Sequence, residues 1–217
     1  MHTGNTAYAL MWCLLSFSMG CNRHSSSDSE KVEKVQSAYL ELARRDLELT
    51  VANYRTAESN SNREVLRLFE DAAFDPERPF VYPPTLLGWA CGVGNMEVIR
   101  RQIEKGKDPN RVTVGEPPMF YACGWNRTNV IEYLIQHGAD PNITLWSPDT
   151  GPNRHPIATP LSTACKHGSL ETVRLLVARG AVVTGDVGEL ARKEASSAPG
   201  VGRWVQSKML DALKAAR

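Results

Sequence analysis

Apolar side chains recur along the chain at the three- and four-residue steps of an amphipathic helix. From residue 85 to residue 184 the pattern comes in pairs: a short apolar stretch, then Gly or Asn, then a second striped stretch that ends near a glycine. Each pair predicts two short helices joined by a tight turn. The stripes of the second helices are formed by Val98 and Ile99, by Val130, Ile131, Leu134 and Ile135, and by Val173, Leu176 and Val177.

The helix pairs are copies of one pattern, aligned on an Ala-Cys pair. The copies read TLLGWACGVGNMEVIRRQIEKGKDPN from Thr85, PPMFYACGWNRTNVIEYLIQHGADPN from Pro117 and TPLSTACKHGSLETVRLLVARGAVVT from Thr159. A period of about 33 residues, with T-P-L-x-x-A opening the first helix and G-A-D-x-N closing the second, resembles the ankyrin repeat. The resemblance implies an all-α fold, an ankyrin-repeat solenoid of helix-turn-helix units with capping helices.

Several positions of the pattern have a mechanical reason. The hydroxyl of Thr85 or Thr159 can cap the first helix of its pair. Gly94, Asn126 and Gly168 fall where the first helix ends and the chain must adopt a left-handed conformation, in which Asn is a tolerated substitute for Gly. The glycines that end the second helices are Gly106, Gly138 and Gly180.

The flanks of the repeats are less regular. NREVLRLFEDAAFDP, from Asn62, matches the second half of a repeat, and the segments 186–195 and 203–217 predict two final helices. Residues 31–61 hold almost no helix breaker and predict one long amphipathic helix, which either caps the stack or extends as a stalk. The resulting solenoid, 62–217, comprises a degenerate unit at 62–84, repeats at 85–116, 117–158 and 159–184, and a C-terminal cap at 185–217.

The connection between the second and third copies is about ten residues longer than the first. Its sequence, ITLWSPDTGPNRHPIA at 143–158, is rich in Pro and Gly and predicts a loop. The resemblance implies that this connection forms the finger, on the same side as the concave face of the stack. Insertions in solenoids often contribute to the binding face.

The first twenty residues carry no Asp, Glu, Lys or Arg, and residues 7–20 are an apolar run that ends at Cys21. Fourteen residues are too few to span a bilayer as a helix, which needs about 20. The run and its cysteine resemble a bacterial lipoprotein signal, although Ser18 replaces the usual Leu and no early cation is present. The resemblance implies a signal peptide at 1–20, lipidation of Cys21, a flexible tether at 21–30 and, from Asn22, sorting to the outer membrane. The alternative is a buried N-terminal helix.

The composition mainly excludes classes of function. With 25 Lys and Arg against 24 Asp and Glu, the net charge of +1 gives no field that would attract nucleic acid. The chain contains no catalytic motif, paired carboxylates or metal-ligand spacing, so we expect no enzyme, cofactor or metal site. Cys91, Cys123 and Cys165 repeat at one place in helices about 8 to 10 Å apart, too far for a disulfide, and are expected to be buried thiols.

The ankyrin resemblance points to binding through the concave positions of the first helices and through the finger. Large aromatics and arginines are common among residues that dominate binding energy, and this surface has four large aromatics and one arginine. The alternative for Trp89 and Trp125 is packing within the stack. The expected partner-binding residues are Trp89, Val93, Tyr121, Trp125, Thr163, Lys166 and His167 on the helices, with Trp146, Arg154 and His155 in the finger.

A small lipid-anchored periplasmic binder without chemistry resembles bacterial immunity proteins that sequester a neighbouring cell's secreted toxin. We therefore expect a monomer that occludes a toxic effector, such as a type VI secretion lipase effector. This resemblance rests on the expected cellular location and the size of the protein, and no sequence motif supports it. Two alternatives stay open: an envelope scaffold or adaptor, and a cytoplasmic ankyrin adaptor that lacks a signal peptide.

Overall fold

The computed structural model describes residues 26–72, 74, 85–111 and 116–216. The signal peptide expected at 1–20, with Cys21, lies outside the described residues. The chain divides into two compact units, Met1–Ala90 and Cys91–Arg217, which are described separately. No helix within the described ranges combines the length and the apolar character needed to cross a membrane.

The first unit contains α2 (Ser26–Arg44), α3 (Val51–Ser59), α4 (Arg63–Asp71) and the start of α5 (Leu86–Val93). The single helix predicted over 31–61 is therefore wrong, since the chain breaks between α2 and α3. Asp46 takes a left-handed φ of 59°, and the amide of Leu47 donates to the carbonyl of Leu42. Thr50 then caps α3 by accepting a hydrogen bond from the Asn53 amide. Asp tolerates this conformation, so neither Gly nor Pro was needed.

Helix α2 begins at Ser26, inside the predicted tether at 21–30. An acidic side chain such as Glu30 near a helix start interacts favourably with the N-terminal end of the dipole. The helix packs on α4, and its Tyr39 ring stacks on Trp89 with centroids 5.2 Å apart. Within this unit α2 is a packed cap, and the stalk alternative is wrong. Its buried residues include Ala38, Tyr39, Leu42 and Ala43.

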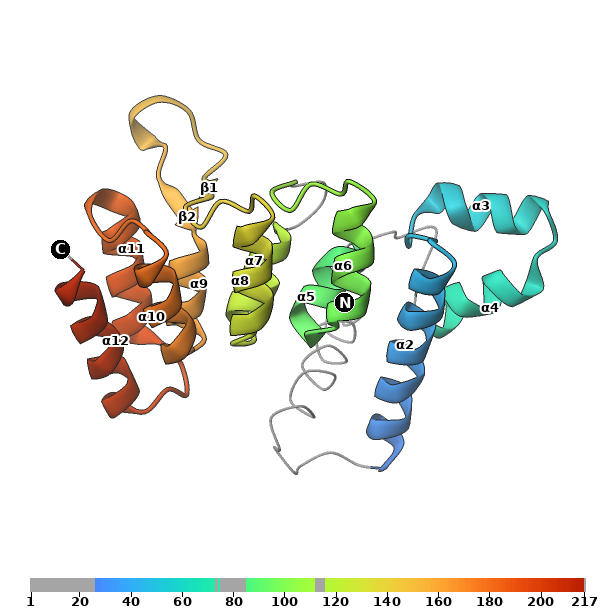
Figure 1. The fold of residues 1–217 in the computed structure, drawn as a ribbon, viewed down its shortest axis with the longest axis horizontal. Coiled ribbons are helices and arrows are strands. Elements are labelled where there is room, and N and C mark those ends of the chain that lie inside the picture. The colour runs from blue at the N-terminus through green and yellow to red at the C-terminus, as the bar shows by residue number, and fades with distance from the viewer. Residues whose placement is uncertain (1–25, 73, 75–84, 112–115, 217) are drawn as a thin grey trace. The chain divides into compact units, whose positions relative to one another are not determined.

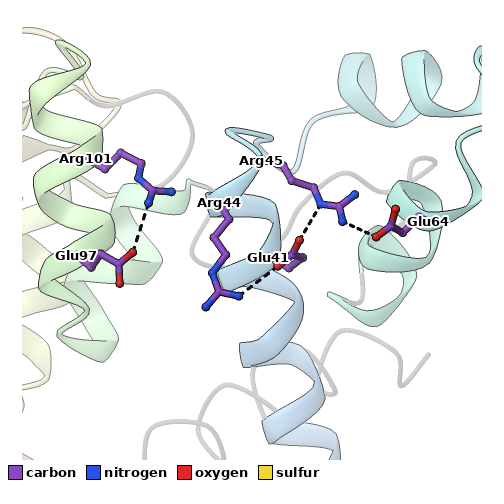
Figure 2. Close-up of polar contacts among 6 residues, drawn as sticks. All are labelled: Glu41, Arg44, Arg45, Glu64, Glu97 and Arg101. Atoms are coloured by element: carbon purple, nitrogen blue, oxygen red, sulfur yellow. Dashed lines mark hydrogen bonds and ion pairs between the residues drawn. The ribbon is translucent and has the colours of Figure 1, made fainter.

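Charged side chains reinforce this packing at the surface. Arg45 of α2 lies between Glu41 on its own helix and Glu64 on α4, and donates hydrogen bonds to both (Figure 2). Lys34 also pairs with Asp71 at the end of α4, with nitrogen and oxygen 2.9 Å apart. Exposed pairs of this kind each contribute little to stability, so the apolar face of α2 remains the main source of its attachment.

The degenerate unit predicted at 62–84 begins with α4, and Asn62 caps this helix by accepting from the Val65 amide. Its first helix is α3, which packs against α4 and had been assigned to the long helix. Phe69 lies at the centre of this pair, fully buried, with Phe74 at 5.1 Å and Tyr54 at 5.7 Å between ring centroids. The chain therefore has a complete first helix pair ahead of the three copies found in the sequence.

The second unit is a stack of paired helices, as predicted. Within it α7 packs against α9 and α9 against α11, while α10 packs against α12, so that the pairs lie side by side (Figure 1). Its helices after α5 are α6 (Met96–Glu104), α7 (Pro118–Gly124), α8 (Thr128–Gln136), α9 (Pro160–Lys166), α10 (Leu170–Ala178), α11 (Gly185–Ser197) and α12 (Arg203–Ala215).

The predicted turn and cap positions are confirmed. Gly94, Asn126 and Gly168 have φ values of 84°, 53° and 70° at the ends of the first helices. Thr85 accepts from the Gly88 amide, and Thr159 forms a reciprocal capping box with Ser162. The three cysteines, Cys91, Cys123 and Cys165, are free thiols with 0% of their surface exposed.

The insertion at 143–158 differs from the predicted loop. It contains β1 (Leu145–Trp146), a short helix η2 (Gly151–Asn153) and β2 (Pro156–Ala158), and the two strands pair antiparallel. Pro and Gly indicated turns correctly but said nothing about pairing between the two sides of the turn. Pro156 starts its strand, a place where the missing amide donor is tolerated.

The two helices predicted for the C-terminal cap are confirmed as α11 and α12. On α12, Met209 and Leu213 are buried and Leu210 is half-buried. Lys214 is exposed, and Lys208 is half-buried.

Candidate functional site

Two of the residues predicted to face a partner lie in the core. Trp89 and Tyr121 are only 5% and 3% exposed, so the expectation that they line an open surface is wrong. Trp89 packs on Tyr39, in line with the alternative of packing within the fold, and the Tyr121 hydroxyl accepts a hydrogen bond from the Glu116 amide. A large ring next to a packed neighbour loses too much apolar burial if it turns outward. Trp89 and Tyr121 therefore contribute to the packing of the helices, and other side chains form the exposed surface.

Trp125 and His167 occupy the same place in successive repeats, directly after the short first helix. Each side chain packs on a glycine of the repeat before it. The Cδ1 atom of Trp125 lies 3.7 Å from the position that a Cβ on Gly92 would take, and the Cδ2 atom of His167 lies 3.6 Å from that of Gly124. The two rings lie beside these glycines and form a stepped strip along the first helices. Trp125 is half-buried in this strip, and His167 is exposed.

The charge of the strip comes from Lys166 rather than from His167. Desolvation lowers the pKa of His167, the positive charge of Lys166 lowers it further, and Glu194 acts in the opposite direction. The imidazole is therefore neutral at pH 7. Lys166 is exposed, whereas the other predicted helix residues, Val93 and Thr163, are half-buried.

The hairpin carries the most exposed apolar side chains of this region. Trp146 on β1 is 41% exposed, and the guanidinium carbon of Arg154 lies 4.8 Å from its ring centroid. Ile157 on β2 is 51% exposed, and His155 is also exposed. The structure therefore groups Trp146 with Arg154 in direct contact. Ile157 was not predicted, because alternation over three strand residues is too short to detect within a segment assigned as a loop.

The hairpin is braced rather than loose. The Ser147 amide donates to the His155 carbonyl at 2.9 Å, and the His155 amide donates to the hydroxyl of the buried Ser147. Strand β2 packs against α11 and leads directly into the Thr159 cap of α9. In Figure 1 the hairpin stands out beyond the ends of the neighbouring helices of its unit. Trp146 and Ile157 are thus presented on a supported frame.

Asparagine side chains set the spacing of the turns on the same side of the stack. Asn110 donates to the Gly138 carbonyl at 2.8 Å and accepts from the Asp140 amide at 2.7 Å. Asn142 makes the same two bonds one repeat later, to the Gly180 carbonyl and from the Val182 amide. Asn142 comes just before the insertion, so this ladder positions the base of the hairpin.

The arrangement offers contact surface rather than reactive groups. Burial raises the pKa of Cys165 to about 12 and keeps its thiol protonated, and it raises the pKa values of Cys91 and Cys123 in the same way. Among the residues that the structure describes, no cluster of three His, Cys, Asp or Glu side chains could hold a metal ion.

Comparison with known proteins agrees with the helix pairs. A family model for ankyrin repeats in three copies matches residues 54–144, and a model for a single ankyrin repeat matches 158–185, together more than half of the chain. Among solved structures 188 chains match. One is the crystal structure of the human ASB11 ankyrin repeat domain, 22% identical over 59% of this chain and 52% of that chain, with a TM-score of 0.43. This chain spans about half the length of that domain. None of the curated proteins matches.

Proposed function

We propose that this chain, which belongs to the ankyrin-repeat family of protein-interaction modules, is an immunity protein that binds and neutralises a secreted antibacterial toxin. The partner binds the hairpin and the strip formed by Trp125, Lys166 and His167. One observation carries the proposal: Trp146, stacked with Arg154, is held exposed on a braced hairpin. An inhibitor needs no chemistry of its own, because covering the toxin's active surface is sufficient.

The energetic argument rests on the exposed apolar area of the hairpin. Trp146 keeps 41% of its surface exposed for a partner to cover, and Trp and Arg are common among residues that dominate binding energy. The hydrogen bonds between Ser147 and His155 already order the hairpin. A partner therefore gains this burial without the entropy cost of ordering a flexible loop.

The place of action is part of the proposal. Lipid on Cys21 would hold a monomer at the periplasmic face of the outer membrane. There the monomer would bind an incoming toxin, such as a type VI secretion lipase effector. Support comes from the uncharged apolar run that precedes Cys21. Replacing Cys21 by Ser tests it: the variant should leave the membrane fraction, whereas unchanged fractionation would favour a cytoplasmic adaptor.

Affinity purification of the native protein from membranes, followed by mass spectrometry, tests the binding function. A Trp125→Ala, Trp146→Ala double variant should lose one stoichiometric partner. Trp204→Ala is the control for loss of an exposed tryptophan, because Trp204 is 67% exposed on α12 and belongs to neither the hairpin nor the strip. A hydrolase or pore-former as partner supports immunity. Several weak partners would favour an envelope scaffold, and a partner indifferent to the double variant would show that the surface is wrong.

A further inference from the structure

Within the part of the chain that the structure describes, the cation on the hairpin has no acidic partner. Elsewhere in the second unit, Arg179 pairs with Glu132 at 2.6 Å and Arg101 with Glu97 at 3.3 Å. Arg154 contacts the Trp146 ring and meets no carboxylate among the described residues. Asp149 is the one acidic residue in the sequence of the insertion, and it forms no ion pair with Arg154 in the described structure.

The position of the Arg154 guanidinium on the Trp146 indole favours binding of a carboxylate. The ring covers one face of the Arg154 side chain and limits its motion, while the N–H donors at the edge of the group remain available. Two parallel N–H donors match the two oxygens of a carboxylate, and such a charge-assisted pair is roughly twice as strong as a neutral hydrogen bond. The exposed Ile157 adds an apolar contact on the same hairpin.

A second cation stands at the other end of the helix that follows the hairpin. Lys166 ends α9, is exposed and has no ion pair among the described residues. Thr163 precedes it by three positions and therefore shares its face of the helix. Helix α9 rises by about 9 Å from its first to its last residue, and the six residues from Arg154 to Pro160 add at most about 20 Å, so an extended segment of about ten residues can reach both cations. Glu194 acts on the neighbouring His167 and weakens the positive field there, so Arg154 is the stronger attraction.

We propose that the segment of the partner protein bound at this surface is acidic. A Glu or Asp carboxylate of that segment pairs with Arg154 on the Trp146 ring, an adjoining apolar side chain covers Ile157, and a second carboxylate reaches Lys166. This inference rests on the proposed function, because it assigns the chemistry of the partner at the same surface. With a net charge of +1 the chain lacks the general positive field of a nucleic-acid binder, so the attraction is local.

Three matched ten-residue peptides test the inference. They share their apolar residues and differ at four positions, which are all Glu, all Gln or all Lys, and calorimetric titration of the full chain measures their affinities. We expect the Glu peptide to bind about ten-fold more tightly than the Gln peptide, as for hydrogen bonds to charged groups. Arg154→Gln should reduce this preference to less than about three-fold, and Lys166→Gln should reduce it in part. Arg174→Gln, which removes an exposed cation on α10, is the matched control and should preserve it.

Equal affinity for the Glu and Gln peptides, or no measurable binding of any peptide, would overturn the inference. So would an equal loss in Arg154→Gln and Arg174→Gln, because it would mean nonspecific attraction. Tighter binding of a ten-nucleotide RNA than of the Glu peptide would assign the cations to nucleic acid instead. If Arg154→Gln captures the native partner normally while the double tryptophan variant does not, the proposed function stands and the acidic segment is wrong.

Discussion

The side chain of Asn126 accepts hydrogen bonds from both the backbone amide and the hydroxyl of Thr172, at 3.3 and 2.9 Å, across two successive repeats. Thr172 is the third residue of α10, whose first amides have no partner within the helix. Ser169, at the usual cap position, makes no side-chain cap bond. The turn of one repeat thus caps the second helix of the next.

This relationship predicts a graded response at position 126. Asn126→Gly removes the cap bonds but accepts the φ of 53°, and should lower the free energy of unfolding by about 1 kcal/mol. Asn126→Ala also places a β-carbon in a left-handed conformation and should cost about 2 to 3 kcal/mol. Urea unfolding followed by circular dichroism measures both. An equal cost for the two variants would show that the cap, and not the backbone conformation, determines the stability.

Gln102 predicts a stabilising substitution. Its side chain is 1% exposed, and its Nε2 atom has no hydrogen-bond partner in the described structure. Leu134 and Leu176 fill the equivalent position in the next two repeats and are fully buried. Gln102→Leu should therefore raise the free energy of unfolding by about 1 to 2 kcal/mol, because it removes an unsatisfied buried donor. Leu134→Gln is the converse control and should lose stability. Destabilisation by Gln102→Leu would contradict the assignment.

Gly188 predicts a strongly destabilising substitution near the base of the hairpin. A β-carbon at this position would lie 2.1 Å from the carbonyl oxygen of Val183, which also accepts a hydrogen bond from Arg192. Gly188→Ala must therefore shift the start of α11, on which β2 packs, at a cost of about 3 kcal/mol. Thermal unfolding measures the loss. In Gly92→Ala the new carbon would meet ordinary contacts at 3.7 Å, so this control should stay within about 1 kcal/mol of the parent.

His167 predicts a dependence of stability on pH. Its pKa in the folded chain lies below the ordinary value of 6.5, because desolvation and then Lys166 disfavour the charged ring. Between the two values the unfolded chain binds more protons, so stability is full above about pH 6.5 and falls as the pH drops below it. His167→Gln should flatten this part of the profile. Nuclear magnetic resonance titration of the ring gives the folded pKa directly, and a value above 6.5 would contradict the desolvation argument.

The repeat architecture was predictable because its signals are local. Cap residues such as Thr85 and Thr159, and turn positions such as Gly94 and Asn126, act within one turn of a helix and recur with the period. The same local reasoning missed the break at Asp46, because Asp is an uncommon choice for a left-handed turn. It also merged α3 with α2, so the first helix of the first pair was overlooked.

The candidate site was predicted only in part. Trp125, Trp146, Arg154, Lys166 and His167 keep surface that a partner can reach. Trp89 carries the same type of side chain but is buried on Tyr39, fifty positions earlier in the chain. Trp89 directly precedes Ala90, as the buried Tyr121 precedes Ala122, whereas Trp125 comes three residues after Ala122. The repeat separates the two positions, but only packing shows which of them is buried.

The sequence by itself determined the period, the helix pairs and the buried Ala-Cys positions of this protein, since each depends on spacing within a repeat. Only the tertiary structure decided which aromatics stay in contact with water, that the insertion pairs as a hairpin, and that Arg154 lies over Trp146. These features depend on contacts between different elements, over eight positions for Arg154 and Trp146 and fifty for Tyr39 and Trp89. The periodicity of the sequence predicts the helices and turns of each repeat, whereas packing between elements decides which side chains remain exposed.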